Sequence, residues 1–241
     1  MQLLILNPNT SVVVTERLRE HVASIAAPEV ALHAATAAFG ARYIADEISF
    51  AVAGHAALDA YASHCQRHGK PDAVLVGCFG DPGVWALREL SGLPVVGLAE
   101  AAMREAAGFG RFAIVTGGVA WDPMLRRLAR AFGFTGALAD VHVVAPTGAQ
   151  LAADPAMALS VLGKACQQAA EGADAVILGG AGLAGMAALL APHLTVPLID
   201  SVTAGARALC GDCSDFVATS LAMTQPVRLE GVSAALQGKL R

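Results

Sequence analysis

The chain has 241 residues, of which 55% are hydrophobic and 15% charged, which suits one large or two small globular domains and excludes a disordered chain. A net charge of −4 excludes the basic surface that binds nucleic acid or anionic membranes. Five scattered cysteines and an N-terminus without a basic leader argue against a disulfide framework and a signal peptide, so we expect a cytoplasmic protein.

The first hundred residues alternate short apolar runs with amphipathic segments. The pattern predicts strands at residues 3–6, 30–33, 73–76 and 95–97, and helices at residues 12–25, 49–68, 82–90 and 100–107. Apolar runs of this length alternating with helices are typical of a parallel sheet covered on both faces.

The same pattern then returns in the second half. Residues 4–7, 72–80 and 93–96 match residues 113–116, 174–182 and 196–199. Such a repeat predicts an α/β fold of two pseudo-symmetric, Rossmann-like lobes, each with a mainly parallel sheet flanked by helices. We assign residues 1–97 and 214–241 to the first lobe and residues 98–213 to the second.

One stretch without charged residues, 175–199, is long enough to cross a membrane. It contains four glycines and two prolines, however, and the repeat places it inside the second lobe. We therefore predict a buried strand, glycine turn, helix, turn and strand, and no membrane partner.

Ligands of open parallel sheets bind beyond the carboxyl ends of the strands, so four loops predict a cleft between the lobes: residues 7–11, 78–83, 116–122 and 180–185. We expect a small-molecule substrate there. The expected substrate-binding residues are Asn9, Ile44, Phe79, Gly80, Thr116, Gly117, Gly180, Ala181 and Gly182.

Cys78 is the candidate catalytic residue. It follows a buried strand and precedes a glycine-rich turn that we expect to open a helix. A thiol at a helix N-terminus has a lowered pKa, which predicts a thiolate near neutral pH. The alternative is a small buried residue at a strand end, a common place for cysteine.

Five segments resemble the hydantoin and allantoin racemases of the aspartate/glutamate racemase family: NPNTS (7–11), GCFGDPG (77–83), GLAEA (97–101), GGAGL (179–183) and VPLID (196–200). The resemblance extends to about residue 204. It implies two α/β lobes, no metal, no cofactor and a homo-oligomer. It also implies that one cysteine removes the α-proton while a second delivers a proton from the opposite face.

The sequence departs from that pattern where the second cysteine is expected, because residue 180 is glycine. The candidates for a replacement acid are a water molecule in the space left at Gly180, the side chain of Asp200 and the side chain of Thr116. Asp200 also suits a structural role as a helix cap. Backbone N–H groups of the two glycine-rich loops are candidates for stabilising an enolate. Tyr43 replaces a smaller polar residue of those racemases, which indicates a changed pocket, and Arg42 is the one cation expected near it.

Three other motifs give weaker indications of a function. GAGLAG (180–185) with Asp200 matches a dinucleotide fingerprint, but the chain after it is too short for a full dinucleotide sheet. Cys210 and Cys213 form a single C-x-x-C pair, and His64 and His68 lie four apart on a predicted helix. Neither pair has the further ligands a metal needs, so we predict no metal site.

Two functional classes stay open. The first is an isomerase, a hydantoin racemase-like enzyme acting through an enolate at Cys78, or a single-thiol decarboxylase or lyase of the same family. The second is a two-lobed protein that only binds a small molecule. A binding protein has no need of a thiol in a glycine-rich loop, so Cys78 favours the enzyme.

Overall fold

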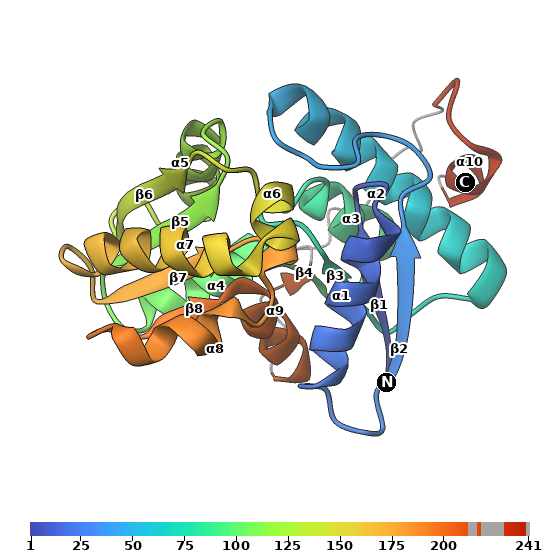
Figure 1. Cartoon of the computed structure of the whole chain (residues 1–241). Helices are drawn as coiled ribbons and strands as arrows, with labels where there is room; N and C mark the ends of the chain where they lie inside the picture. The colour runs from blue at the N-terminus through green and yellow to red at the C-terminus, as the bar shows by residue number, and fades with distance from the viewer. Residues whose placement is uncertain (212–215, 218–228, 240–241) are drawn as a thin grey trace.

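The computed structural model describes residues 1–211, 216–217 and 229–239. Its first lobe holds a sheet of four parallel strands, with the N-terminal strand paired to both its neighbours (Figure 1). The strands are β1 (Gln2–Asn7), β2 (Ala31–Thr36), β3 (Ala73–Val76) and β4 (Val95–Gly97), in the order β2-β1-β3-β4. The helices between them are α1 (Val12–Ala23), α2 (Glu47–His68) and α3 (Val84–Ser91).

The second lobe repeats this design. Its parallel strands are β5 (Phe112–Gly117), β6 (Leu138–Val144), β7 (Ala175–Gly179) and β8 (Leu198–Asp200), in the order β6-β5-β7-β8. The equivalent strand order confirms the predicted repeat and the two-lobed α/β fold. The intervening helices are α5 (Trp121–Ala131), α6 (Gly148–Ala153), α7 (Pro155–Ala170), the short η1 (Ala181–Leu183), α8 (Met186–Leu190) and η2 (Ala191–His193).

The central strands of the first lobe are buried on both faces. Leu3 and Ile5 face one hydrophobic cluster, whereas Leu4 and Leu6 face another beneath α2 and α3. Successive side chains of a strand point to opposite faces, so a strand between two helical layers needs an unbroken apolar run. This requirement explains the run in the sequence.

Two helices join the lobes. α4 (Leu98–Ala107) follows the first sheet yet packs against β7 and β8, while α9 (Ser201–Cys210) follows the second sheet yet packs against β3 and β4. The two helices also contact each other, in the middle of Figure 1. A Cβ atom on Gly205 would lie only 2.9 Å from Leu75, so this glycine lets α9 approach the first sheet closely. The lobe boundary at residues 97 and 98 stays a prediction.

The C-terminal helix α10 (Ala234–Lys239) packs against α2 of the first lobe. The remaining part of the segment 214–241 lies largely outside the described residues, so its assignment to the first lobe also stays a prediction.

Element boundaries differ from the sequence prediction at a few ends. The helix predicted from residue 82 begins at Val84, because Gly83 has a left-handed backbone with φ of 79°. The weak second strand extends to Thr36 through its pairing with β1. Residues 175–199 fold as strand, turn, short helix and strand, and within the described ranges no helix is long and apolar enough to cross a membrane.

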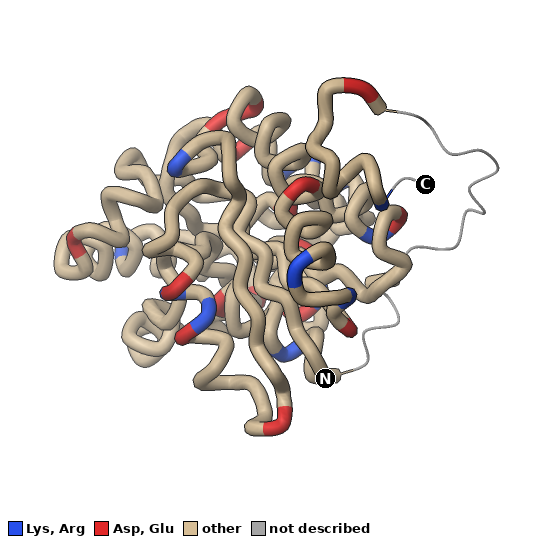
Figure 2. Tube along the Cα trace, turned by 90° about the vertical axis from the view of Figure 1, so that its right-hand side faces the viewer, with Lys and Arg blue, Asp and Glu red and all other residues tan. Residues whose placement is uncertain are grey.

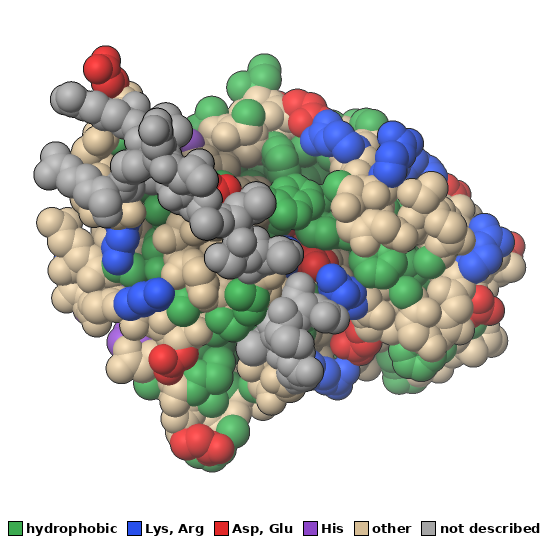
Figure 3. All heavy atoms as spheres, turned by 180° about the vertical axis from the view of Figure 1, so that it is seen from behind, with side chains coloured by type: hydrophobic (Ala, Val, Ile, Leu, Met, Phe, Trp, Pro, Cys, Tyr) green, Lys and Arg blue, Asp and Glu red, His purple; other side chains and the backbone are tan. Residues whose placement is uncertain are grey.

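Charged residues are spread along the described trace, with acidic and basic positions interspersed (Figure 2). On the rear face, basic and acidic side chains lie beside each other between exposed hydrophobic ones (Figure 3). Several charged residues of the chain form ion pairs. Arg126 contacts Asp122 and Asp140, and Arg127 contacts Glu47 of the other lobe.

Candidate active site

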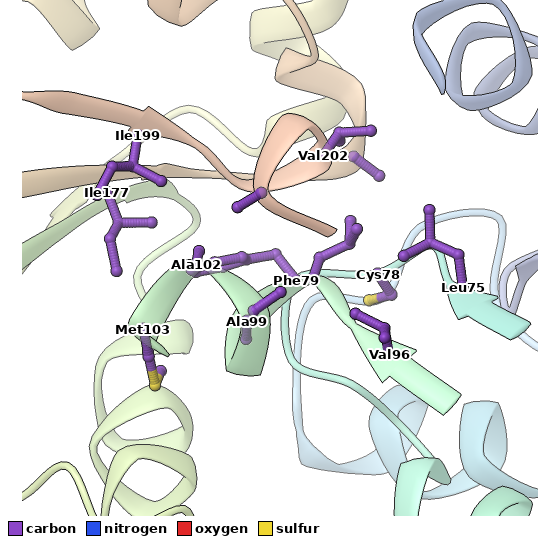
Figure 4. Packing of buried hydrophobic residues seen from close by; sticks show 14 of the residues in the cluster. Leu75, Cys78, Phe79, Val96, Ala99, Ala102, Met103, Ile177, Ile199 and Val202 are labelled. Carbon is purple, nitrogen blue, oxygen red and sulfur yellow. The ribbon is translucent and has the colours of Figure 1, made fainter. Parts of the chain in front are cut away.

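The loops after β3 and β7 meet face to face between the lobes. A Cβ atom on Gly179 would lie 2.2 Å from the ring of Phe79, so the aromatic ring packs directly on the second lobe's strand end. Figure 4 shows Phe79 near Ala99 and Ala102 of α4, with Cys78 beside it. The face-to-face arrangement expected from the repeat is therefore present.

A cavity of about 100 Å³ lies at this junction. Eight of the ten predicted site residues line it: Asn9, Ile44, Cys78, Phe79, Thr116, Gly180, Ala181 and Gly182. The other lining residues are Ser11, Val14, Arg42, Tyr43, Gly77, Trp121, Gly148, Ala149, Ala152 and Gly179.

Gly80 and Gly117 do not line the cavity. A Cβ atom on Gly80 would lie 2.5 Å from the ring of Trp121, and one on Gly117 would lie 2.6 Å from Leu151. Both glycines instead allow close packing of neighbouring groups behind the pocket wall.

Cys78 is 8% exposed, and the lowered pKa expected for it is wrong. Burial, and to a lesser extent the carboxylate of Asp81, raise the pKa of the Cys78 thiol well above its ordinary value. The helix dipole does not offset this because α3 begins only at Val84, beyond the turn. Burial therefore favours the protonated thiol form of Cys78.

Asp81 shapes the Cys78 loop. It is the one non-glycine residue with positive φ, 56°, in the described part of the chain. Its carboxylate accepts hydrogen bonds from the N–H groups of Ala99 (2.9 Å) and Glu100 (2.8 Å), which caps α4. Burial raises the pKa of Asp81 to about 7, although these two hydrogen bonds favour its ionised form.

The loop after β1 positions Asn9. The Asn9 side-chain oxygen accepts hydrogen bonds from Asn7 Nδ2 (2.9 Å) and the Ser11 N–H (2.8 Å). Its own amide nitrogen has no hydrogen-bond partner among the described residues and belongs to a side chain that lines the cavity. Asn9 therefore offers a donor to a bound carbonyl oxygen.

The Gly180 loop has a different backbone. Gly180 has φ of 144° and ψ of 125°, and its N–H donates to Ser201 Oγ at 3.2 Å. The Thr116 hydroxyl donates to the Gly179 carbonyl at 2.8 Å, so its proton is already engaged. Thr116 is therefore a poor candidate for the replacement acid.

Asp200 does not line the cavity. Its carboxylate accepts hydrogen bonds from the N–H groups of Val202 and Thr203, which begin α9, and of Gly185. Asp200 is therefore a structural cap, which was the alternative role considered for it. Because its carboxylate is engaged in this way, it does not serve as the acidic residue of a dinucleotide-binding motif.

Backbone N–H groups of both glycine-rich loops remain available at the cavity. Within the described ranges, the N–H groups of Phe79, Ala181 and Gly182 make no hydrogen bond, and all three residues line the cavity. Unpaired N–H groups at such a position suit a developing enolate oxygen. With Asn9 and Arg42, they make this a cavity rich in donors.

Sequence reasoning missed the wall contributed by α5 and α6. Trp121, Gly148, Ala149 and Ala152 line the cavity from the second lobe. Trp121 lies within the predicted loop 116–122, although the sequence prediction does not name it as a site residue. The small residues of α6 carry no chemical signal, and only the fold brings them to the site.

The remaining motifs lie elsewhere. The rings of His64 and His68 are joined by that of His33, with ring centres 5.0 to 6.2 Å apart. No three histidine, cysteine or acidic side chains within residues 1–211, 216–217 and 229–239 are placed to hold a metal. Cys213 of the C-x-x-C pair lies outside the described residues.

The chain is similar to a known protein family and to characterised proteins. The family described as Asp/Glu/Hydantoin racemase matches residues 3–209. The hydantoin racemase of Paenarthrobacter aurescens is 32% identical over 210 residues, which cover 86% of this chain and 89% of that protein.

Two solved structures are also similar. The allantoin racemase of Klebsiella pneumoniae is 30% identical with a TM-score of 0.89 and covers 98% of both chains. The allantoin racemase of Pseudomonas fluorescens is 26% identical with a TM-score of 0.84, covering 91% of this chain and 94% of that one.

Proposed function

Because the chain belongs to the Asp/Glu/hydantoin racemase family, we propose that it is a cofactor-independent, racemase-like isomerase acting through Cys78. The substrate is a hydantoin-like ring or another amino-acid derivative with an α-proton next to a carbonyl. The thiolate form of Cys78 takes that proton, and the electron pair of the C–H bond moves into the enolate.

The observation that carries this proposal is the combination of one thiol with a set of donors in one cavity. Asn9 and Arg42, with the unpaired N–H groups of the two glycine-rich loops, match the carbonyl oxygens of such a substrate. The same groups stabilise the enolate more strongly than the neutral substrate, which is how they would accelerate proton removal.

Gly180 stands, in this proposal, where related racemases carry the second thiol. Glycine has no proton to give, so a different group must serve the opposite face, or the proton returns to the face it left.

A single-thiol decarboxylase or lyase is the second candidate. It is favoured by one specific observation: Cys78 is buried, and this burial raises the pKa of its thiol. A thiol that holds its proton is suited to protonating an enolate left by loss of carbon dioxide.

The test is a turnover screen with both enantiomers of 5-substituted hydantoins and allantoin, and with arylmalonates. NMR in D₂O follows exchange of the α-proton or loss of carboxylate, and polarimetry follows inversion. We expect exchange and inversion of a hydantoin-type substrate by the natural protein, and in Cys78→Ser the loss of inversion and of exchange of at least one enantiomer. Cys166→Ser is the matched control, because Cys166 is buried in the second lobe's core away from the cavity. Binding of these compounds without any turnover would contradict the proposal.

A further inference from the structure

Tyr43 connects the two lobes across the cavity. It belongs to the segment between β2 and α2 in the first lobe and lines the cavity together with Cys78. Its phenolic oxygen accepts a hydrogen bond at 2.8 Å from the N–H of Gly148, the first residue of α6 in the second lobe. The contact needs glycine at this position, because a Cβ atom on Gly148 would lie 2.6 Å from the phenolic oxygen.

The phenolic oxygen of Tyr43 accepts a hydrogen bond, whereas its own O–H group donates none to the described residues. Besides the Gly148 N–H, the side chain of Trp121 lies close enough to lower the pKa of Tyr43, and an indole nitrogen is a donor only. No acceptor for the Tyr43 O–H group is found in the described part of the chain. The hydroxyl therefore has a proton to give, and the two donors would stabilise the tyrosinate left behind.

The phenol lies on the side of the cavity that lacks a thiol. Gly148 borders the turn that begins at Gly180, since a Cβ atom on Gly182 would lie 3.5 Å from the Gly148 carbonyl oxygen. Cys78 enters the cavity from the other lobe's strand end. The Tyr43 side chain also starts from the first lobe, but its phenolic oxygen contacts α6 of the second lobe, beside the turn that begins at Gly180.

We propose that Tyr43 is the second proton-transfer group of this site, taking the part that a thiol at position 180 would play. The inference rests on the proposed function. Cys78 thiolate removes the α-proton of one enantiomer, giving an enolate and a Cys78 thiol. The enolate carbon then takes the phenolic proton from Tyr43, and the O–H electron pair stays on the tyrosinate. The other enantiomer reacts in reverse, with tyrosinate as the base and the Cys78 thiol as the acid.

The electrostatics of the pair agree with this exchange of roles. Burial raises the pKa of Tyr43, the hydrogen bonds from Gly148 and Trp121 oppose that rise, and a negative charge on Cys78 adds to it. Charge on one group therefore disfavours charge on the other, so that one is protonated while the other is ionised.

The experiment compares proton exchange of the two enantiomers separately. Natural protein, Tyr43→Phe and Cys78→Ser are each incubated in D₂O with the D- and the L-form of a 5-substituted hydantoin, and NMR and polarimetry follow exchange and inversion. We expect each variant to lose exchange of a different enantiomer by about 100-fold or more, and both to lose inversion.

Two further variants guard against a purely structural effect. Gly148→Ala displaces the phenol and should impair the same enantiomer as Tyr43→Phe. Tyr61→Phe alters a buried tyrosine outside the cavity and should leave both enantiomers unaffected.

The possible failures are distinguishable. If Tyr43→Phe slows both enantiomers equally, or inverts as fast as it exchanges, the role of Tyr43 is overturned while the proposed function stands. If the natural protein exchanges neither enantiomer of any substrate in the screen, the proposed function falls and this inference falls with it.

Discussion

The two glycine-rich loops occupy equivalent places in the two lobes, yet they differ in chemistry and in backbone. The first ends its strand with a buried thiol, and the Asp81 carboxylate of the same loop caps the helix that crosses to the other lobe. The second ends with Gly180 at φ of 144°, and its crossing helix is capped by Asp200 from the following strand. A repeated fold therefore supplies two equivalent positions, while only one of them carries a reactive side chain.

The comparison also shows how a loop changes the acidity of a thiol. The Asp81 carboxylate, which the first lobe needs to cap α4, lies close enough to raise the pKa of Cys78. Asp200 performs the same capping function without lining the cavity. Both lobes therefore use an aspartate to cap the crossing helix, but only the aspartate of the first lobe also raises the pKa of the thiol in the cavity.

The largest effect is expected from removing the reactive group of the first loop. Cys78→Ser replaces a thiol by a hydroxyl of similar size that ionises far less readily. We expect turnover to fall by roughly 10²- to 10⁴-fold, with an unchanged circular dichroism spectrum and melting temperature. Turnover at the natural rate by this variant would remove Cys78 from the mechanism.

The acidity of the same loop predicts a pH dependence. Since the base is the thiolate and the pKa of Cys78 is raised, the ionised fraction grows with pH, and kcat/KM should increase through the neutral and alkaline range without levelling near pH 7.

Asp81→Asn removes the nearby negative charge and should shift this profile to lower pH. Asp200→Asn is the matched control in the other lobe, because it alters the equivalent cap away from the cavity, and its profile should stay in place. Equal shifts in both variants would show that general destabilisation, and not the charge at Asp81, sets the profile.

A smaller effect is expected from adding a side chain to the second loop. Gly180→Cys and Gly180→Ala both place a Cβ atom on a backbone with positive φ, 3.3 Å from Leu183. We expect each to lower the free energy of unfolding by about 1–2 kcal/mol, measured by urea denaturation.

In the Tyr43→Phe background, only the cysteine variant should raise inversion relative to exchange, because it alone adds a second proton-transfer group. A gain in inversion by the alanine variant would mean that the shape of the loop, and not its missing acid, limits the reaction.

The smallest expected effect is that of chelation. The proposed proton transfers use side chains alone, so incubation with EDTA followed by dialysis should leave turnover unchanged. Loss of turnover that zinc restores would place a metal in the mechanism.

The sequence by itself was sufficient for the repeat, the parallel sheets and the meeting of the two loops. These follow from local patterns, because buried strands need unbroken apolar runs and parallel strands bring their carboxyl ends to one edge. Most of the pocket residues from these loops, Cys78 and Phe79 among them, could be named for the same reason.

The tertiary structure alone decided the acidity of Cys78 and the surroundings of Tyr43. A pKa depends on burial and on charges that come from elsewhere in the chain, and the sequence around Cys78 pointed to a helix N-terminus that begins too late to act. The hydrogen bond from Gly148 to Tyr43 joins residues 105 positions apart. Local periodicity carries no information about such a contact, which exists only because the two lobes pack together around the cavity.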